Sequence, residues 1–273
     1  MNEVHPAGEP KSLSEQIQRD GYVVLRNLMD SQELEHLLNH ADNFWDTLHD
    51  PQRPQSKLEV HGAAVAQIAS VRMAACKKRL IDTVLTLLGP NIYVNYIGFT
   101  INPPQSEDKQ HMAYHQDGGR ISKEHAQFFE PRYTVKAAIW LTDGTRLGVG
   151  NFYVIPGSHR WKQKPDTKID ELAIPVYVEP GDVILFERRV WHTRKTNTSN
   201  TRRKVLFVDY APRWMEPKCQ MDITPPPTYS SPVEEQLFNN KETWRAYAPR
   251  KIDLPALDYM SSAGLTRSVE DES

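Results

Sequence analysis

A histidine stands two residues before an aspartate at two places in the sequence, in His40-Ala41-Asp42 and in His115-Gln116-Asp117. Imidazole nitrogens and carboxylate oxygens are ligands for divalent transition metals. Side chains at positions i and i+2 point the same way on a β-strand but about 200° apart on a helix. The first pair falls in a stretch with helical spacing, whereas Tyr114–Asp117 follows a β-type run and precedes Gly118-Gly119. We therefore expect His115 and Asp117 to bind a metal together.

His192 is the expected third ligand. It follows a Glu-Pro-Gly-Asp turn and the short apolar run Val183–Phe186, which predicts a neighbouring strand. A lone histidine in such a place is more often a buried hydrogen-bonding group. The combination with His115 and Asp117 favours a ligand, because two histidines and one carboxylate leave three positions open on iron(II), enough for a bidentate cosubstrate and O₂.

An anionic cosubstrate requires a cation at the far end of its pocket, and guanidinium binds a carboxylate through two parallel hydrogen bonds. Three consecutive basic residues, Arg202, Arg203 and Lys204, open the last predicted strand. Because successive side chains of a strand point to opposite faces, Arg203 points to one face and Arg202 and Lys204 point to the other. Since apolar residues follow on both faces, the periodicity leaves open which basic residue points inward.

Lys136 lies within the apolar β-run Val135–Trp140, where an inward-facing cation must meet an anion or else point to solvent. The sequence leaves both possibilities open. His159 is expected to be structural, within a Pro-Gly-Ser-His turn, and Asn197 and Ser199 are expected to hold a loop through bonds to backbone.

The stretch 188–213 is rich in Arg and Lys and could line a pocket for an anionic substrate, although a solvated rim is the more usual outcome. Trp191 is expected to pack in the wall of the site. Weaker candidates for contact with a substrate are Arg120, His111, His125 and Tyr114.

Composition places the chain among globular proteins with one sizeable core. It has 273 residues, 39% of them hydrophobic, and a formal net charge of -2. No overall basic field exists to hold nucleic acid or an anionic membrane surface. Only two cysteines and no apolar leader segment or membrane span are present, which favours a reducing, cytoplasmic location. The sequence lacks a P-loop and the GxGxxG, GxSxG and HExxH motifs, so the corresponding enzyme classes are not expected.

The order of expected elements indicates an all-β core with flanking helices, a barrel or jelly roll, in a single domain. Helical patterns cover Leu13–Arg19, a stretch beginning near Asp30, Lys78–Leu88 and Val233–Tyr247. We expect a helical flank over residues 12–90, the β core over 91–214 and a C-terminal cover over 215–273. A strand is expected to start at Tyr22–Leu25, and the strands of the predicted core are Ile92–Ile101, Met112–Gln116, Tyr133–Leu141, Phe152–Ile155, Ala173–Val178, Val183–Phe186, Val190–Thr193 and Val205–Tyr210.

The sequence resembles the phytanoyl-CoA dioxygenase family of 2-oxoglutarate oxygenases from about Asp20 to Trp214, through four motifs: YHQDGGR, NFYVIPGSHRW, VEPGDVILFERRVWH and TNTSNTRRKVLFVDYAPRW. The resemblance implies a double-stranded β-helix, the cupin-like jelly roll, that holds Fe(II) through His115, Asp117 and His192. It further implies that Arg203, eleven positions after His192, pairs with the C5 carboxylate of 2-oxoglutarate.

The same resemblance bears on the reaction. Family members that halogenate have a small residue in place of the carboxylate ligand, and this sequence keeps Asp117. Hydroxylation or desaturation of a small molecule with O₂ is therefore favoured, and a tailoring step in secondary metabolism is the expected setting. The alternatives are an acyl-CoA hydroxylase, a non-catalytic cupin-like barrel that binds a metal or small ligand, and a zinc hydrolase, for which no general base stands near the ligands.

Overall fold

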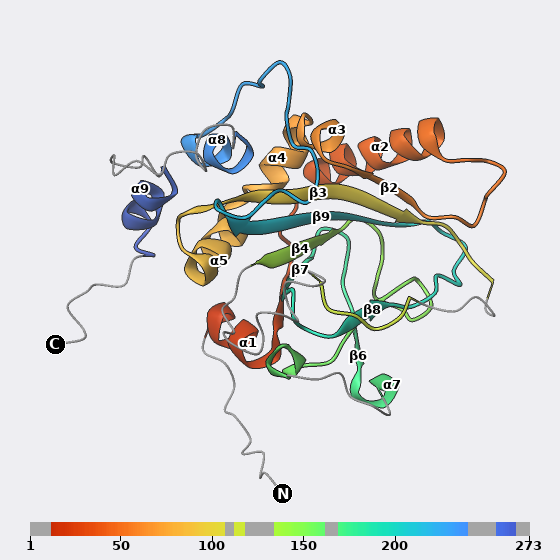
Figure 1. Ribbon diagram of the computed structural model, residues 1–273. Helices are drawn as coiled ribbons and strands as arrows, with labels where there is room; N and C mark the ends of the chain where they lie inside the picture. The colour runs from red at the N-terminus through yellow and green to blue at the C-terminus, as the bar shows by residue number, and fades with distance from the viewer. Residues whose placement is uncertain (1–11, 107–111, 118–133, 162–168, 240–254, 266–273) are drawn as a thin grey trace, which may run out of the picture.

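The structure is a computed structural model, and it describes residues 12–106, 112–117, 134–161, 169–239 and 255–265. Three layers make up this part of the chain (Figure 1): a layer of helices, a large antiparallel sheet and a small antiparallel sheet. The two sheets form the β core that the sequence predicts, and the helices flank it. Among the described residues, no helix is long and apolar enough to cross a membrane.

The large sheet has six strands in the order β1-β7-β4-β9-β3-β2, each antiparallel to its neighbours. Its long central pair joins β3 and β9, and Asn102 lies opposite Arg203 at one end of that pair. The strand bounds are β1 Tyr22–Leu25, β2 Leu58–His61, β3 Ile92–Asn102, β4 Val135–Trp140, β7 Val183–Glu187 and β9 Arg203–Pro212.

The small sheet has three strands in the order β6-β5-β8, with bounds β6 Ile174–Val176, β5 Phe152–Val154 and β8 His192–Arg194. Between the two sheets lies an apolar cluster that includes Trp140, Phe152 and Phe186. A second, larger cluster lies between the large sheet and the helices. Strand β9 therefore has two buried faces, because Val205 belongs to the first cluster while Leu206 and Val208 belong to the second.

The helices of the N-terminal flank pack on the large sheet, and side chains at the start of α2 cap that helix. Helices α2, α3 and α5 contact strands of that sheet. Helix α2 begins with a capping box in which the side chains of Asp30 and Glu33 each accept a hydrogen bond from the other's backbone N–H. The helix bounds are α1 Leu13–Asp20, α2 Ser31–Leu48, α3 Ala63–Ala66, α4 Ala69–Ala75 and α5 Lys78–Leu88. After β5 the chain forms the 3-10 turn Ser158–Arg160 and then helix α7 Ile169–Leu172.

Gly21 joins helix α1 to strand β1 with φ 82, in the left-handed region. A Cβ at this position would lie 2.6 Å from Nδ1 of His159, too close for any other residue. The buried His159 ring in turn bonds the backbone oxygen of Gln18 through Nε2 at 3.1 Å. His159 therefore fixes the chain between α1 and β1, which is the structural role expected of it.

The C-terminal helices α8 Pro232–Phe238 and α9 Pro255–Ser262 pack on the same side as the flank, with α8 against α4 and β3 and α9 against α5 and α8. A buried ion pair fastens α8: Arg72 Nε lies 2.7 Å from Glu234 Oε1, with side chains only 3% and 2% exposed. Figure 1 shows these two helices at one end of the large sheet. That residues 215–273 act as a cover over one end of the barrel stays a prediction.

Two features of the fold differ from the expectation. The predicted strand Met112–Gln116 is wrong, because the segment forms a single bridge between His115 and His192. Strand β2 and helices α3 and α4 lacked a prediction, although residues 63–75 are rich in alanine, the strongest helix former. Of the predicted helix Val233–Tyr247, residues 240–247 lie outside the described part of the chain.

The buried pair between Arg72 and Glu234 gives a stability prediction. Glu234→Ala leaves a buried guanidinium without its carboxylate, so we expect the free energy of unfolding to fall by about 3 to 5 kcal/mol. Arg53→Ala is the control, because Arg53 pairs with Asp50 on the exposed surface, and its effect should stay within about 0.5 kcal/mol. Urea denaturation followed by circular dichroism measures both, and equal stability of the two variants would contradict the role of the buried pair.

Candidate active site

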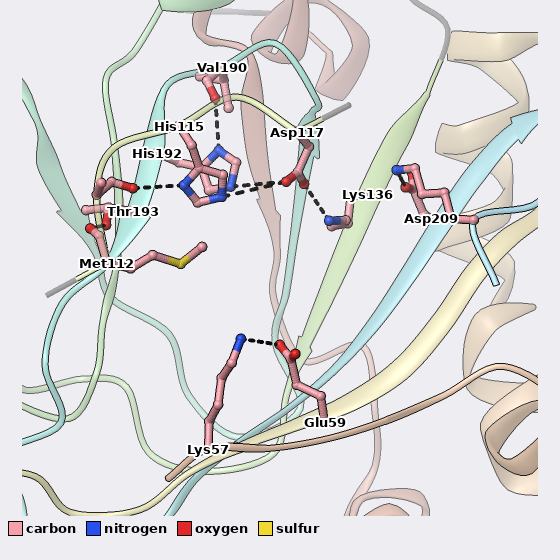
Figure 2. A network of polar contacts seen from close by, with 12 residues as sticks. Lys57, Glu59, Met112, His115, Asp117, Lys136, Val190, His192, Thr193 and Asp209 are labelled. Carbon is pink, nitrogen blue, oxygen red and sulfur yellow. Dashed lines mark hydrogen bonds and ion pairs between the residues drawn. The ribbon is translucent and has the colours of Figure 1, made fainter. Parts of the chain in front are cut away.

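The structure brings His115, Asp117 and His192 together at one point. Nε2 of His115 and Nε2 of His192 lie 3.7 and 3.9 Å from the same oxygen, Oδ1 of Asp117. One ligand atom from each of the three residues lies within 4.8 Å of the others. Figure 2 shows the two rings and the carboxylate turned toward one another. In the described part of the chain, these residues make the one group of three that could hold a metal ion.

Backbone bonds set this arrangement. His115 and His192 exchange reciprocal N–H···O bonds of 3.0 Å, and the backbone N–H of Asp117 donates to the oxygen of Arg188 at 2.8 Å. The hydroxyl of Thr193 donates to the backbone oxygen of Met112. The segment 112–117 is thus fixed along β8 and the turn before it, although it is not a strand.

Each imidazole is oriented by its second nitrogen. Nδ1 of His115 lies 3.0 Å from the backbone oxygen of Ala113, and Nδ1 of His192 lies 2.9 Å from that of Val190. A carbonyl oxygen only accepts hydrogen bonds, so Nδ1 carries the proton in both rings. The lone pair on each Nε2 then faces the point shared with Asp117, as a metal ligand requires.

The protonation states of two of the three residues also suit a divalent cation. Burial lowers the pKa of His192 to about 4, although the neighbouring Asp117 acts in the opposite direction. Burial by itself would raise the pKa of the Asp117 carboxyl, but the charges of Lys136 and His192 outweigh it and hold this pKa well below its ordinary value. At neutral pH the site therefore offers a neutral imidazole and an ionised carboxylate.

A pocket of about 820 Å³ opens over these residues. Both sheets contribute to its wall: Phe152 comes from β5, Phe186 from β7 and Phe207 from β9. Polar and charged residues of the wall are Lys57, Glu59, Asn95, Thr100, Asn102, Lys136, Arg188, Arg194, Arg203, Glu216 and Lys218. The cavity has the size of a small-molecule site.

Arg203 faces this pocket from the start of β9 and is only 3% exposed. Its Nη1 donates to Oδ1 of Asn102 at 2.9 Å, and its guanidinium lies 4.5 Å from the ring centre of Trp140. No acidic side chain of the described residues forms an ion pair with it, and both Nε of Arg203 and Nδ2 of Asn102 are buried without a hydrogen-bond partner. Burial, and secondarily Arg194, lowers the pKa of Arg203 to about 9.

The neighbours of Arg203 point the other way. Lys204 and Arg202 both lie against Asp42 of helix α2, on the helical side of the large sheet. Gly150, with φ 75, lies close beside Arg203, since a Cβ there would be 2.8 Å from Cδ of Arg203. The structure therefore resolves the direction that periodicity left open, and Arg203 is buried without a counter-ion among the described residues. A carboxylate would satisfy the free donors.

Asn197 and Ser199 take the places that the sequence suggested. Asn197 is buried and donates to backbone oxygens of Asn102 and Thr201, and the Ser199 hydroxyl donates to Asn197, so both are architectural.

Tyr114 and Trp191 differ from the expectation, because neither is among the residues that line the pocket. The Tyr114 hydroxyl donates to Asp170 at 3.0 Å, and Trp191 packs with Tyr114 in a small apolar cluster. His111, Arg120 and His125 lie outside the described residues.

Two features of the site lacked a prediction: the bond from Asn102 to Arg203 and the partner of Lys136. Arg194 lines the pocket, one of the two places that the sequence left open for the basic stretch 188–213. Arg194 stands two residues after His192 on β8, so its inward direction follows from strand alternation. The sequence signal for Asn102 is weaker, because its contact depends on the pairing register of β3 and β9.

The profile of the phytanoyl-CoA dioxygenase (PhyH) family matches residues 17–205. Dioxygenase af480 of Aspergillus fumigatus is 29% identical over 164 residues, which are 58% of this chain and 50% of that protein. Dioxygenase andF of Emericella variicolor is 23% identical over 210 residues, 70% of each chain. The chain thus spans about half the length of the first relative and more of the second.

Two solved structures share the fold. EctD from S. alaskensis with bound Fe has a TM-score of 0.60 at 22% identity, covering 83% of this chain and 84% of that one. The epimerase SnoN, in complex with Fe3+, alpha ketoglutarate and nogalamycin RO, has a TM-score of 0.57 at 19% identity, covering 73% and 82%. The predicted fold class, an all-β jelly roll with flanking helices, is confirmed by this likeness.

The lowered pKa of His192 predicts how the metal-free protein responds to acid. An unfolded histidine takes up a proton near its ordinary pKa of 6.5, whereas folded His192 does so only near 4. Stability is therefore unaffected above pH 6.5 and falls as the pH drops toward 4, by about 2 to 3 kcal/mol between pH 7 and 4.5. Asp117 adds nothing to this window, since an unfolded aspartate titrates near 3.8 and folded Asp117 lower still.

The measurement is urea denaturation of the metal-free wild-type protein and of His192→Leu at pH 7 and 4.5. The wild-type protein should lose about 2 to 3 kcal/mol more than the variant, because leucine carries no titrating group. An equal loss in both proteins would show that burial of His192 does not cause the acid sensitivity.

Proposed function

The chain belongs to the phytanoyl-CoA dioxygenase family, and from this premise we propose that it is an Fe(II)- and 2-oxoglutarate-dependent dioxygenase acting on a small organic molecule. The proposed reaction oxidises an unactivated C–H bond by hydroxylation, desaturation or oxidative removal of a group. Succinate and CO₂ would be released from the cosubstrate. A tailoring step in secondary metabolism is the proposed setting, since SnoN comes from nogalamycin biosynthesis.

One observation carries the proposal: Arg203 is a buried guanidinium without a carboxylate partner among the described residues, and it lines the same pocket as His115, Asp117 and His192. A buried unpaired charge is costly, so its retention indicates that an anion completes the site. A non-catalytic barrel that only binds a metal has no use for such a cation. 2-Oxoglutarate has a carboxylate at each end, one for the metal and one for Arg203.

Different residues of this chain would bind the metal and the cosubstrate. His115, Asp117 and His192 would hold Fe(II) on one side, with Nε2, Oδ1 and Nε2 as the ligand atoms that already converge. Arg203 and Asn102 would bind the C5 carboxylate of 2-oxoglutarate through their free N–H groups. Bound Fe(II) and 2-oxoglutarate would together supply the oxidant that attacks a C–H bond by activating O₂.

The protein's further contribution is orientation and exclusion of water. Phe152 and Phe186 contact the His192 ring, with ring centres 5.1 and 5.0 Å away, and restrict access of water from the β-core side. Phe207 adds an apolar surface to the pocket. Asp117 also argues against halogenation, since the carboxylate occupies the place that a halide ligand would need. These features support oxidation of a bound small molecule over hydrolysis.

The proposal predicts a visible signature without turnover. Anaerobic addition of Fe(II) and 2-oxoglutarate should produce a metal-to-ligand charge-transfer band, because the keto acid chelates the metal. A redox-silent barrel or a zinc hydrolase should produce no such band. Asp117→Ala should lose the band through loss of one metal ligand, and absorption spectra under nitrogen measure both proteins.

Arg203→Ala predicts a separate effect on the cosubstrate. A charge-assisted hydrogen bond contributes about 1.5 to 3 kcal/mol, so the 2-oxoglutarate concentration needed for half-maximal succinate release should rise roughly 10- to 100-fold. The matched control is Arg202→Ala, because Arg202 lies on the opposite face near Asp42 and Asp46. Unchanged dependence on 2-oxoglutarate in Arg203→Ala would contradict the assigned role.

A further inference from the structure

The second oxygen of Asp117 has a partner of its own, Lys136 on strand β4. Nζ of Lys136 forms an ion pair with Oδ2 of Asp117, while Oδ1 of the same carboxylate faces Nε2 of both histidines. Figure 2 shows the carboxylate between the two imidazole rings on one side and the lysine on the other. The two oxygens of one carboxylate thus have different tasks.

Lys136 is held in this position from several sides. Its side chain is only 17% exposed and lies near the ring of Phe207, at 5.6 Å from the ring centre. Across the sheet its register partner on β9 is Asp209, which pairs with Lys218 of the C-terminal segment. The charges alternate in sign from Asp117 through Lys136 and Asp209 to Lys218.

The surroundings of Lys136 suit a cationic donor. Asp117 pairs with its Nζ, and Asp209 lies opposite it in the register of β4 and β9. An ammonium group donates hydrogen bonds and accepts none, and Oδ2 of Asp117 is the acceptor that it meets. The lysine is therefore a donor fixed on one oxygen of the proposed metal ligand.

We propose that Lys136 is a positioning residue that holds Oδ2 of Asp117 away from the metal, so that this carboxylate binds through Oδ1 alone. The inference rests on the proposed function, because it takes Asp117 as a metal ligand. A carboxylate that binds through one oxygen uses one coordination position and leaves the others for cosubstrate and O₂. Hydrogen-bonded partners of metal ligands generally set ligand orientation in this way.

A competing physical effect makes the test decisive. The ammonium group also repels a divalent cation, and if that repulsion were its main effect, removal of Lys136 would tighten metal binding. If the orientation of Asp117 is the main effect, removal of Lys136 should weaken metal binding, because the Asp117 carboxylate can then rotate. Asp209, opposite Lys136 on β9, also loses a neighbouring cation. The two effects have opposite signs.

The experiment titrates the metal-free protein with Co(II) and follows its visible absorption, which reports both affinity and the number of ligands. We expect Lys136→Met to raise the Kd for Co(II) roughly 10- to 100-fold and to change the shape of the spectrum. Lys136→Arg should restore most of the affinity, because guanidinium still donates to Oδ2. If Lys136→Met is poorly folded, Lys136→Gln, which removes the charge but keeps an NH₂ donor group, takes its place.

Lys204→Met is the matched control. Lys204 lies on β9 with 11% exposure and also pairs with an aspartate, Asp42, but on the opposite face of the sheet. The thermal stability of Lys204→Met should equal that of Lys136→Met. Its Kd for Co(II) should equal that of the wild-type protein. A Kd for Lys136→Met equal to or below that of the wild-type protein overturns the proposal.

Asp117→Ala separates this proposal from the function itself. If Asp117→Ala binds Co(II) as well as the wild-type protein, the metal centre lies elsewhere and both proposals fail. If Asp117→Ala loses Co(II) binding while Lys136→Met keeps it, the metal centre stands and only the positioning role of Lys136 is wrong.

Discussion

Two reciprocal backbone hydrogen bonds between His115 and His192 hold the candidate centre together. The segment that carries His115 and Asp117 is not part of either sheet, and this single bridge aligns it with β8. With the bridge in place, both Nδ1 atoms meet nearby carbonyl oxygens and both Nε2 atoms turn toward Asp117. Together with the bond from the Asp117 N–H to the oxygen of Arg188, this pairing between a loop and a three-residue strand sets the orientation of the whole centre.

Charge is distributed around this point in a consistent way. Asp117 is balanced by Lys136, and Asp209 is balanced by Lys218, so the acidic groups beneath the pocket have cations of their own. Arg203 differs, because none of the described carboxylates pairs with it and its Nε is buried without a hydrogen-bond partner. Paired charges at the proposed metal site, and beyond them a cation that no described carboxylate pairs with, are what a cosubstrate with a carboxylate at each end would require.

The sequence predicts much of this arrangement from local rules. Strand alternation excluded His40 and Asp42, which indeed lie in helix α2, and it tied Arg203 to one face of β9. The pattern could not choose that face, since Val205 and Leu206 are both buried in apolar clusters. Whether Lys136 points to solvent or meets an anion was likewise undetermined, because its partner Asp117 is 19 residues away and meets it only through the tertiary fold.

The most direct test of the account is a crystal structure grown without oxygen in the presence of Mn(II) and 2-oxoglutarate, with the metal located by its anomalous scattering. We predict one strong peak between Nε2 of His115, Oδ1 of Asp117 and Nε2 of His192, with 2-oxoglutarate extending from it to the guanidinium of Arg203. A metal bound elsewhere, or a cosubstrate carboxylate that does not reach Arg203, would contradict the account.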